Sequence, residues 1–361
     1  MNAAGAAGGP HAWMIVPASP ERFDGVRDFA SHLATALAPH GRVQTFTTAG
    51  DREPAPGTQV LPSWRALDPR TFPPRTIYVN YIPQSWLRRD LPALLSRIRA
   101  ARAAGARVIV IVHEYQLDPG PSLTRRAARV VFRRMARAFA SRAHAVVTTH
   151  GFVAGLARAD RLDTRTTLAS IPVGSNIAGP PGQPSTLREG IVMFGQPAGM
   201  APAVVAAVAR AAAARQVPLT WICRSENEAR AWLARHGVPA EPIRIAAGLD
   251  EAAVSHMLNA AAVGFAPNDD GVSTRRTTIA ALLQHGLPVI GTDGRTTDPV
   301  FRESGAFALA PAGDPAAAAA SVDKILLDSA LRDRMSAAAR GLFEAHLSWP
   351  RIAAQYARLA S

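Results

Sequence analysis

The feature that most restricts the fold of this chain is a regular alternation of short apolar runs with helical patterns. In the run Val108–Val112 every residue is a β-branched aliphatic one, which is typical of a strand buried on both faces of a parallel sheet. In the stretch Val26–Leu37, apolar residues recur at positions 26, 29, 30, 33, 34 and 37, which is the spacing of an amphipathic helix. The alternation predicts an α/β fold with parallel sheets covered by helices.

The alternation occurs twice along the chain. Between the two series lies Gly174–Pro184, whose three glycines and three prolines indicate a linker. The 361 residues, 48% of them hydrophobic, suffice for two domains, and we expect two doubly wound Rossmann-like domains facing a cleft. Strands are expected at 13–17, 43–47, 76–81, 107–113, 145–149 and 167–172, then at 191–195, 219–223, 243–245, 263–266 and 288–291. Helices are expected at 26–37, 91–104, 122–142 and 151–158, then at 201–214, 226–236, 250–261, 275–285, 314–328 and 331–345.

The positive charge of the chain is concentrated in its first half. Residues 1–178 hold 23 arginines against 11 acidic residues, whereas residues 179–361 hold 17 basic residues against 16 acidic ones. This asymmetry indicates an anionic partner for the first half, such as a membrane surface, an acidic glycan or a nucleic acid. Aromatic residues make up only 6% of the chain. Because single-stranded nucleic acids bind largely by stacking on aromatic rings, we expect no nucleic-acid partner.

One segment of the basic half has the composition of a helix that lies on a membrane surface. The expected helix near 122–142 carries Arg125, Arg126, Arg129, Arg133, Arg134 and Arg137. Its apolar surface comes from Leu123, Val130, Val131, Phe132, Met135 and Phe139. A basic amphipathic helix suits docking to anionic lipid headgroups. The alternative is a solvated helix face in an arginine-rich protein.

The remaining composition indicates a cytoplasmic protein. Cys223 is the only cysteine, which excludes a disulfide within the chain and a Cys-rich zinc site. The first ten residues have neither a basic region nor a sustained apolar core, so we expect no secretory signal. No uncharged apolar stretch reaches the ~18 residues of a membrane span. Any link to the inner face of the cytoplasmic membrane is therefore expected to be peripheral, through the helix near 122–142.

The segment Asn268–Thr292 resembles the signature of a known family. It reads Asn-Asp-Asp-Gly-Val-Ser-Thr-Arg-Arg-Thr-Thr-Ile-Ala-Ala-Leu-Leu-Gln-His-Gly-Leu-Pro-Val-Ile-Gly-Thr. Retaining glycosyltransferases of the GT-B fold, in particular those of family 4, have a similar signature. It consists of an acidic residue, a glycine, a small-residue turn and a helix that ends in Gly-x-Pro-Val-Ile.

Other segments resemble motifs of this family in the same order along the chain. They are Asp24-Gly25-Val26, His113-Glu114, Val146-Val147-Thr148-Thr149, Ile171-Pro172-Val173-Gly174, Phe194-Gly195 and Leu347-Ser348-Trp349-Pro350. By this resemblance, residues 1–178 form the acceptor-side domain, 185–345 form the domain that binds the nucleotide sugar, and 346–361 form a helix that packs back on the first domain. The resemblance also implies transfer from a nucleotide diphosphate sugar without a metal or another cofactor.

The resemblance implies a donor site on the second domain. The backbone N–H groups of Gly271, Val272 and Ser273 would point at the diphosphate, and Arg275 and Arg276, in the first turn of helix 275–285, would neutralise its charge. The alternative is that one or both of these arginines point to solvent. The other donor-binding positions that the resemblance implies are Gly25, Gly195, Arg224 and Thr278.

Asp270 stands at the first acidic position of the family's Glu-x7-Glu motif, which implies that it accepts hydrogen bonds from donor-sugar hydroxyls. The alternative is an aspartate that caps a helix or stabilises a turn. Thr278 replaces the second glutamate, and its hydroxyl can make only one weaker hydrogen bond to a ribose. The family also carries Arg and Lys shortly after the glycine at position 195, but Gly195–Met200 contains no basic residue. Either Arg275, Arg276 or Arg224 substitutes, or the donor differs, or activity is lost.

His113 ends the apolar strand 107–113 at the sheet edge where α/β proteins bind ligands. By the resemblance it contacts the donor sugar or positions the acceptor, and with Asp270 it is the expected catalytic residue. The alternative is a buried structural histidine. We expect Asn80, Tyr81 and Glu114 to lie on the acceptor side.

The resemblance implies a metal-independent hexosyltransferase. Such an enzyme would move a sugar, with retention of configuration, from a nucleotide diphosphate sugar to a glycan or lipid-linked acceptor in bacterial polysaccharide or glycoconjugate synthesis. One alternative is a non-catalytic glycosyltransferase-like subunit, which the missing basic pair and Thr278 favour. Another is a sugar-nucleotide epimerase, which would need acid and base groups across the cleft.

Overall fold

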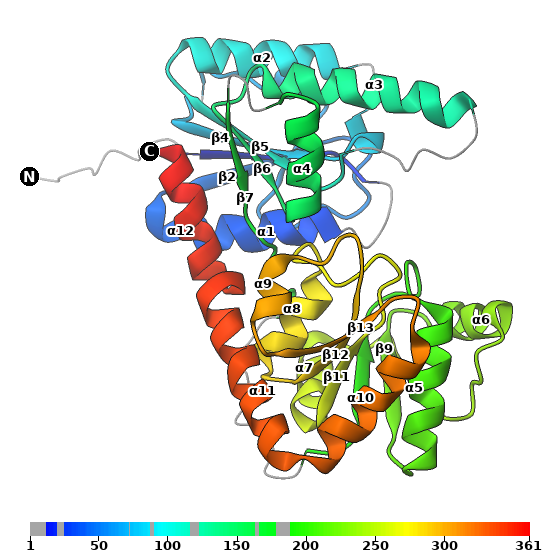
Figure 1. Cartoon of the computed structure of the whole chain (residues 1–361). Coiled ribbons are helices and arrows are strands. Elements are labelled where there is room, and N and C mark those ends of the chain that lie inside the picture. Colours follow the sequence, from blue (N-terminus) through cyan, green and yellow to red (C-terminus); the bar gives the residue numbers. More distant parts are fainter. Residues whose placement is uncertain are drawn as a thin grey trace, which may run out of the picture. The chain divides into compact units, whose positions relative to one another are not determined.

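The computed structural model describes residues 12–19, 25–71, 73–86, 90–115, 123–162, 166–177 and 188–361. They form two compact units (Figure 1). Unit 1 comprises the chain up to Pro172 together with Trp349–Ser361, and unit 2 comprises Val173–Ser348. The first crossing between units therefore falls at 172 rather than at the expected 178. Residues 178–187, which include most of the expected linker, lie outside the described part of the chain.

Unit 1 is built on a parallel sheet with the strand order β3-β2-β1-β4-β5-β6-β7. The strands are β1 (Ala12–Ile15), β2 (Val43–Thr48), β3 (Gln59–Leu61), β4 (Thr76–Tyr81), β5 (Arg107–Val112), β6 (Ala145–Thr148) and β7 (Thr167–Ser170). The central strands β4, β5 and β6 are buried along their whole length except at Arg107, as the continuous apolar runs predict.

Helices cover both faces of this sheet (Figure 1). On one face lie α2 (Leu91–Ala103), α3 (Leu123–Ala140) and α4 (Gly151–Ala159), whose apolar sides share one core cluster. On the other face, α1 (Gly25–Leu37) packs beside α12 (Trp349–Ala360). The rings of Phe29 and Trp349 join these two helices, with their centroids 5.6 Å apart. Short 3-10 turns span Ala38–His40, Trp64–Ala66 and Gln84–Trp86.

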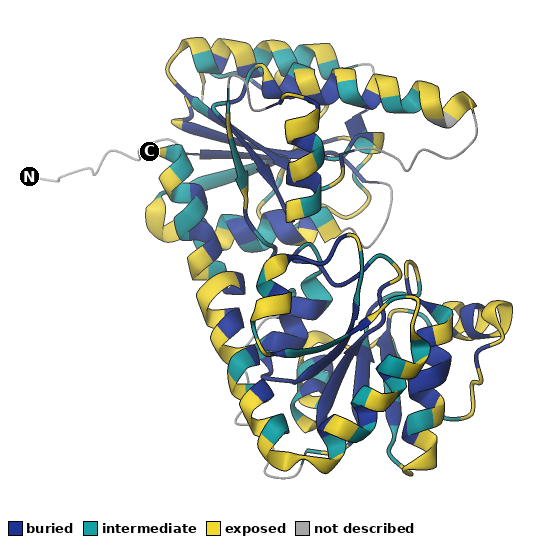
Figure 2. Cartoon of the chain, viewed as in Figure 1, coloured by how far each residue is buried: buried dark blue, intermediate teal, exposed yellow. Residues whose placement is uncertain are grey.

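Unit 2 repeats the arrangement with the strand order β10-β9-β8-β11-β12-β13, again all parallel. The strands are β8 (Ile191–Phe194), β9 (Leu219–Cys223), β10 (Ile243–Ala247), β11 (Val263–Ala266), β12 (Val289–Asp293) and β13 (Phe307–Pro311). The helices are α5 (Pro202–Ala214), α6 (Glu226–His236), α7 (Glu251–Ala260), α8 (Thr277–Gln284), α9 (Pro299–Glu303), α10 (Pro315–Leu327) and α11 (Ser329–Leu342), and a π-helical turn follows at Phe343–Leu347. In Figure 2 the strands of unit 2 are mostly dark blue, because helices bury the sheet on both sides.

Three elements have no counterpart in the sequence-based expectation: β3, β13 and α9. Two of the three residues of β3 are exposed, and most of β13 is only half-buried. Neither strand therefore has the continuous apolar run that marks a doubly covered strand. The helix α9 has only five residues, which is too few for a helical period to be recognised in the sequence.

Candidate functional site

The strand order of unit 2 reverses between β8 and β11, so the chain leaves these neighbouring strands in opposite directions across the sheet. Such a switch point is where open α/β sheets bind ligands. The two loops that follow β8 and β11 are joined there. Asp269 N donates to Gly199 O at 3.0 Å, Ala201 N donates to Pro267 O at 2.8 Å, and Met200 pairs with Asn268. The structure thus brings the expected positions near 195 and near 270 together.

The carboxylate of Asp270 pairs with two arginines, Arg275 and Arg276, in the loop after β11. Its Oδ2 accepts from an Nη2 of Arg275 and its Oδ1 from an Nη2 of Arg276, both at 3.2 Å. The three side chains are 34%, 22% and 24% exposed for Arg275, Arg276 and Asp270 respectively. The arginines are therefore partly desolvated rather than free in solvent, and a single carboxylate serves both guanidinium groups.

Arg276 reaches the loop in which the sequence has no basic residue. A Cβ built on Gly199 would lie 3.6 Å from Nη2 of Arg276 and 3.5 Å from Oδ1 of Asp269. The guanidinium therefore lies against the loop after β8, although Arg276 follows β11 in the chain. Burial and the neighbouring Arg275 cation lower the pKa of the Arg276 side chain, and Asp270 and Asp269 oppose that change.

The helix after this loop begins later than expected. It starts at Thr277, and Arg276 is its N-cap residue with extended dihedrals (φ −101°, ψ 107°). The prediction that Arg275 and Arg276 lie in the first helical turn is wrong, and so is an N-cap role for Asp270 in this helix. Arg276 makes no side-chain capping bond to α8, and Ile279 N donates to Arg276 O at 3.1 Å, so the N-cap side chain supplies no acceptor to the first N–H groups of this helix. Thr278 lies beside the other loop, because a Cβ on Gly195 would meet its Cγ2 at 3.6 Å.

The turn at 271–273 differs from the prediction. The N–H of Gly271 donates to Asn268 O at 3.2 Å, and the N–H of Val272 donates to Thr292 O at 3.0 Å. These two N–H groups are thus used within the fold and do not point at a ligand. The side chain of Val272 is fully buried in the core. The prediction that these two N–H groups point at the diphosphate is therefore corrected.

Three buried polar atoms in the same loops have no hydrogen-bond partner among the described residues. They are the Oγ of Ser273, the Oδ1 of Asn268 and the Nε of Arg276. Buried polar atoms are normally paired, and leaving one unpaired costs about 1–3 kcal/mol. With the uncapped start of α8, these atoms provide hydrogen-bonding capacity that the protein itself does not use.

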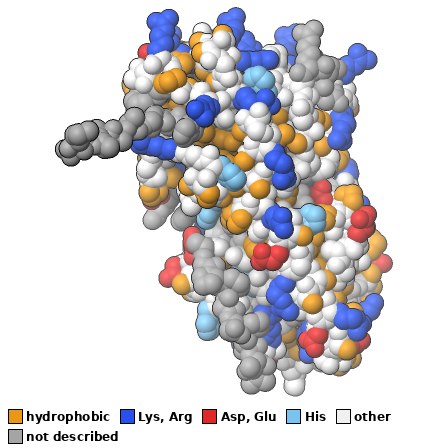
Figure 3. Space-filling view, turned by 90° about the vertical axis from the view of Figure 1, so that its left-hand side faces the viewer, with side chains coloured by type: hydrophobic (Ala, Val, Ile, Leu, Met, Phe, Trp, Pro, Cys, Tyr) orange, Lys and Arg blue, Asp and Glu red, His pale blue; other side chains and the backbone are white. Residues whose placement is uncertain are grey.

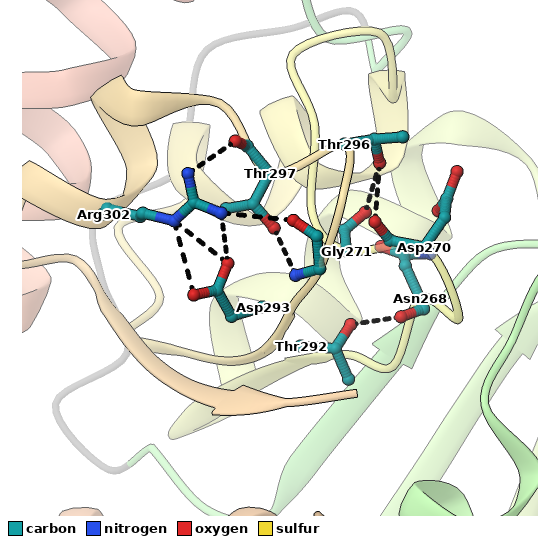
Figure 4. Close-up of polar contacts among 9 residues, drawn as sticks. Asn268, Asp270, Gly271, Thr292, Asp293, Thr296, Thr297 and Arg302 are labelled. Atoms are coloured by element: carbon teal, nitrogen blue, oxygen red, sulfur yellow. Dashed lines mark hydrogen bonds and ion pairs between the residues drawn. The ribbon is translucent and has the colours of Figure 1, made fainter. Parts of the chain in front are cut away.

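A second loop, which the sequence-based reasoning missed, supports the first. Arg302 of α9 contacts both oxygens of Asp293: Nη2 donates to Oδ1 at 2.6 Å, and Nε donates to Oδ1 at 3.0 Å and to Oδ2 at 3.3 Å. It also donates to the carbonyls of Thr297 and Gly294, both at 3.1 Å (Figure 4). The segment Thr292–Asp298 reads Thr-Asp-Gly-Arg-Thr-Thr-Asp directly after an apolar strand. Such a cluster of polar and turn-forming residues indicates a loop, so the sequence did contain a signal for this second loop of the site.

The second loop, Thr292–Asp298, accepts and donates hydrogen bonds that hold the backbone around Asp270 in place. Thr296 donates to Asp270 O from its N–H at 2.8 Å and from its hydroxyl at 2.9 Å. Figure 4 shows the hydroxyl contact. Asp298 accepts from the N–H and the hydroxyl of Thr274, each at 2.8 Å. The carboxylate of Asp270 thus projects from a backbone that is hydrogen-bonded on either side of it.

The Arg302–Asp293 pair predicts a pH effect on stability. The hydrogen bond from Arg302 is the main cause that lowers the pKa of Asp293 below its ordinary 3.8, against a smaller effect of burial. A carboxylate with a lowered pKa in the folded state stabilises the fold above its unfolded pKa, and this contribution is lost as the pH falls through the folded pKa. We expect Asp293→Asn to be less stable than wild type at about pH 7, with the difference in unfolding free energy shrinking below about pH 4.

Urea unfolding of both proteins across this pH range measures the effect. Asp333→Asn, at an exposed carboxylate on α11, is the control for the change in charge. A difference between wild type and Asp293→Asn that stays constant down to about pH 2 would contradict the assignment.

In unit 1, His113 follows β5 and is held by its neighbours. Its Nε2 lies 2.9 Å from Oδ1 of Asn80, and Asn80 Nδ2 donates to Ile15 O at 3.1 Å. Because the Asn80 amide nitrogen is used by Ile15, Oδ1 is the acceptor and His113 Nε2 carries the proton. The ring of Phe29 packs edge-on against His113 at 4.8 Å. His113 is half-buried and Asn80 is fully buried.

The other residues expected in unit 1 lie in different environments. Tyr81 is a core residue, since its side chain is fully buried and its hydroxyl donates to Phe132 O at 3.1 Å. We therefore correct its assignment to the acceptor side. Glu114 is exposed and accepts from Gln84 at 3.1 Å. Gly25 begins α1, and a Cβ there would meet no atom within 4 Å. Asp24 lies outside the described residues.

Arg224 lies in the loop after β9 and not in the two joined loops after β8 and β11. It directly follows β9, which borders β8 on the side away from β11, and its side chain is exposed.

Within the described ranges, no group of three His, Cys, Asp or Glu side chains is placed to bind a metal. Nor is any described helix both long and apolar enough to span a bilayer.

Solved structures with the same arrangement of two sheets are known. A sucrose-phosphate synthase from Thermosynechococcus elongatus has a TM-score of 0.66 at 17% identity, over 96% of this chain and 97% of that one. A glycosyltransferase from Rickettsia africae has a TM-score of 0.66 at 12% identity, over 97% of each chain. This chain has the GT-B fold. The HepE protein of Anabaena, solved with UDP and glucose, has the same GT-B architecture, with a TM-score of 0.66 at 12% identity over 96% of this chain and 98% of that one.

No protein-family model matches the sequence of this GT-B chain, and no curated protein matches it. At identities of 12–17%, the structural likeness defines the architecture. The assignment of individual residues therefore depends on the geometry of the site itself.

Proposed function

We propose that this GT-B protein is a glycosyltransferase that takes a sugar from a nucleoside diphosphate sugar, with the diphosphate bound at Arg275, Arg276 and the start of α8. One observation carries the proposal. Two partly desolvated guanidinium groups and an uncapped helix N-terminus gather at the switch point of unit 2. Such an arrangement suits an anion with several oxygens. The presence of UDP and glucose in the HepE structure, a protein of the same fold, supports this choice of ligand.

The proposed chemistry needs no metal to neutralise the leaving group. When the bond between the sugar and the diphosphate breaks, negative charge develops on the diphosphate oxygens. Arg275, Arg276 and the first N–H groups of α8 would stabilise this charge by hydrogen bonds that are already oriented in the folded protein. Arg276 would thereby replace the basic residues that the loop Gly195–Met200 lacks.

We assign two roles to Asp270. It orients both arginines, since each of its oxygens accepts from one of them. A carboxylate oxygen has more than one acceptor position, so Asp270 can also receive hydroxyls of the donor sugar. His113, with its ring fixed by Asn80, is the proposed contact of the transferred sugar or of the acceptor on unit 1.

The finer assignments follow the resemblance in the sequence. We propose transfer of a hexose with retention of configuration to a glycan or lipid-linked acceptor, in bacterial polysaccharide or glycoconjugate synthesis. Unit 1 would bind the acceptor, and a lipid-linked acceptor would bring the enzyme to the inner surface of the cytoplasmic membrane. The strong positive charge of residues 1–178 suits an acceptor that carries phosphate groups.

A product assay tests the proposed function. The protein is incubated with UDP-, GDP-, ADP- and dTDP-sugars in turn, together with a bacterial extract of glycans and lipids as acceptor. We expect release of nucleoside diphosphate from one donor class and transfer of the labelled sugar to the extract. Conversion of a donor into an isomeric nucleotide sugar, without release of the diphosphate, would identify an epimerase instead. If no donor is bound or turned over, the non-catalytic alternative replaces this proposal.

A further inference from the structure

The helix α3 has an unusual outer side. The helix as a whole contains six arginines and no acidic residue. Its inner side packs into the core of unit 1 through Phe132, Met135 and Phe139, which are each at most 6% exposed. Both aromatic residues of the helix are thus on the buried side. Figure 2 shows exposed residues along the opposite side of α3.

Large apolar side chains are exposed on this outer side among the arginines. Leu123 is 79% exposed, Val130 50% and Val131 46%. Only three other large apolar side chains of the described residues are exposed, and they lie far apart in the sequence, at Val60, Leu249 and Leu327. A concentration of exposed apolar residues on one element marks an interaction surface more often than single ones do.

The helical repeat places Leu123 and Val130 in one row along α3, with Val131 on the flank, about 100° round the helix from Val130. Leu123 and Val130 are seven residues apart, which is nearly two full turns of about 3.6 residues each. Arg134 and Arg137 follow one and two turns further along the same side, and Arg126 lies beside Leu123. Over these 15 residues the row measures about 21 Å, at about 1.5 Å per residue. The row combines apolar side chains with cations throughout its length.

Two of these arginines make no ion pair with any residue that the structure describes. Arg133 is paired with Asp160, but Arg126 and Arg134 are exposed and have no acidic partner among the described residues. The wider surface of unit 1 has the same sign, and on the face in Figure 3 its arginines clearly outnumber its acidic side chains. Charge complementarity therefore calls for an anionic partner at α3.

We propose that the outer side of α3 docks on an anionic lipid bilayer. Leu123 and Val130, with Val131 on the flank, would enter the boundary between headgroups and acyl chains, and Arg126 and Arg134 would contact lipid phosphates. Arg137 is left out of this set, because its Nη2 donates to Asp160 O at 3.4 Å. A nucleic acid fits this surface less well, because the outer side of α3 offers no aromatic ring for stacking. An acidic protein could pair with the arginines. The outer side of α3 is a single convex helix, however, and offers such a partner no groove in which to bury the three apolar side chains. The proposal extends beyond glycosyl transfer and does not depend on it.

Vesicle cosedimentation with the full-length chain tests the proposal without any activity measurement. The vesicles are phosphatidylcholine alone, or phosphatidylcholine with a quarter of phosphatidylglycerol, at low and physiological salt. We expect binding to the anionic vesicles that weakens as salt rises, and at least tenfold weaker binding to the neutral ones. Arg126→Gln with Arg134→Gln, and separately Leu123→Ser with Val130→Ser, should each weaken binding to anionic vesicles at least tenfold.

The controls use matched residues of unit 2. Arg235→Gln with Arg244→Gln removes two exposed charges, and Leu327→Ser removes an apolar side chain that is 69% exposed. Both control proteins should bind vesicles as wild type does, and circular dichroism should show that every variant is folded. Equal binding by all variants, or no binding to anionic vesicles at low salt, overturns the proposal. Retention of the protein by polyglutamate or RNA beads but not by vesicles overturns it in favour of that partner class.

Discussion

Replacing Arg276 with glutamine is expected to weaken the binding of the cognate nucleoside diphosphate about 10- to 100-fold. Hydrogen bonds to charged groups contribute about 1.5–3 kcal/mol each, and about 1.4 kcal/mol corresponds to a factor of ten in the dissociation constant. Arg276 is less exposed than Arg275 and lies against the loop after β8. The substitution removes the more desolvated of the two cations. Isothermal titration calorimetry of the variant and of wild type measures the ratio.

Two further variants make this result specific. Arg230→Gln removes an exposed arginine that pairs with Glu226 on α6, and it should leave nucleotide affinity unchanged. Asp270→Asn removes the negative charge that holds Arg275 and Arg276, so we expect weaker binding of both the free diphosphate and the sugar conjugate. If only the conjugate is affected, Asp270 contacts the sugar without positioning the arginines. Full affinity in Arg276→Gln would place the diphosphate elsewhere.

Replacing Gly271 with alanine is expected to lower the free energy of unfolding by about 2–5 kcal/mol, which combines a backbone cost of about 1–2 kcal/mol with overpacking of about 1–3 kcal/mol. Gly271 has a φ of +99°. A Cβ there would lie 2.3 Å from Thr297 Oγ1 and 2.7 Å from Gly294 N. The glycine thus permits the loops after β11 and β12 to meet, and it is needed for the fold rather than for approach of a ligand. Urea unfolding measures the loss.

The matched control is Gly237→Ala. Gly237 also has a positive φ (+63°), but a Cβ there would have no atom within 4 Å. This variant isolates the backbone cost of about 1–2 kcal/mol. If Gly271→Ala loses no more stability than Gly237→Ala, the steric part of the argument is wrong.

The sequence predicted two doubly wound α/β domains because its central strands are continuous apolar runs, and the resemblance of Asn268–Thr292 to a family signature added the GT-B fold. The run in β5 shows this most clearly, since every residue from Val108 to Val112 is buried. Edge strands were harder to detect. Residues 59–61 form β3 at the edge of the unit 1 sheet, where two of three side chains face solvent. An edge strand has little apolar signal, because only part of its surface is covered.

The candidate site was predictable in outline and not in detail. Residues near 195 and near 270 follow neighbouring strands, and parallel strands end at one edge of the sheet, so their proximity follows from the fold class. Which atoms face the site depends on the loop backbone. The N–H of Val272 donates to the carbonyl of Thr292. Arg276 precedes α8 in an extended conformation, and its side chain reaches Gly199. Contacts of this kind join segments that are distant in sequence, and no local pattern encodes them.

The central claim is that Arg275, Arg276 and the start of α8 bind the diphosphate of a nucleotide donor. Calorimetric titration of wild-type protein with UDP, GDP, ADP and dTDP, and with the matching monophosphates, tests it most directly. We predict that one nucleoside diphosphate binds at a ratio of one to one and at least tenfold more tightly than its monophosphate, because the second phosphate meets the two arginines. Equal affinity for the diphosphate and the monophosphate, or no binding of any nucleotide, would contradict the claim.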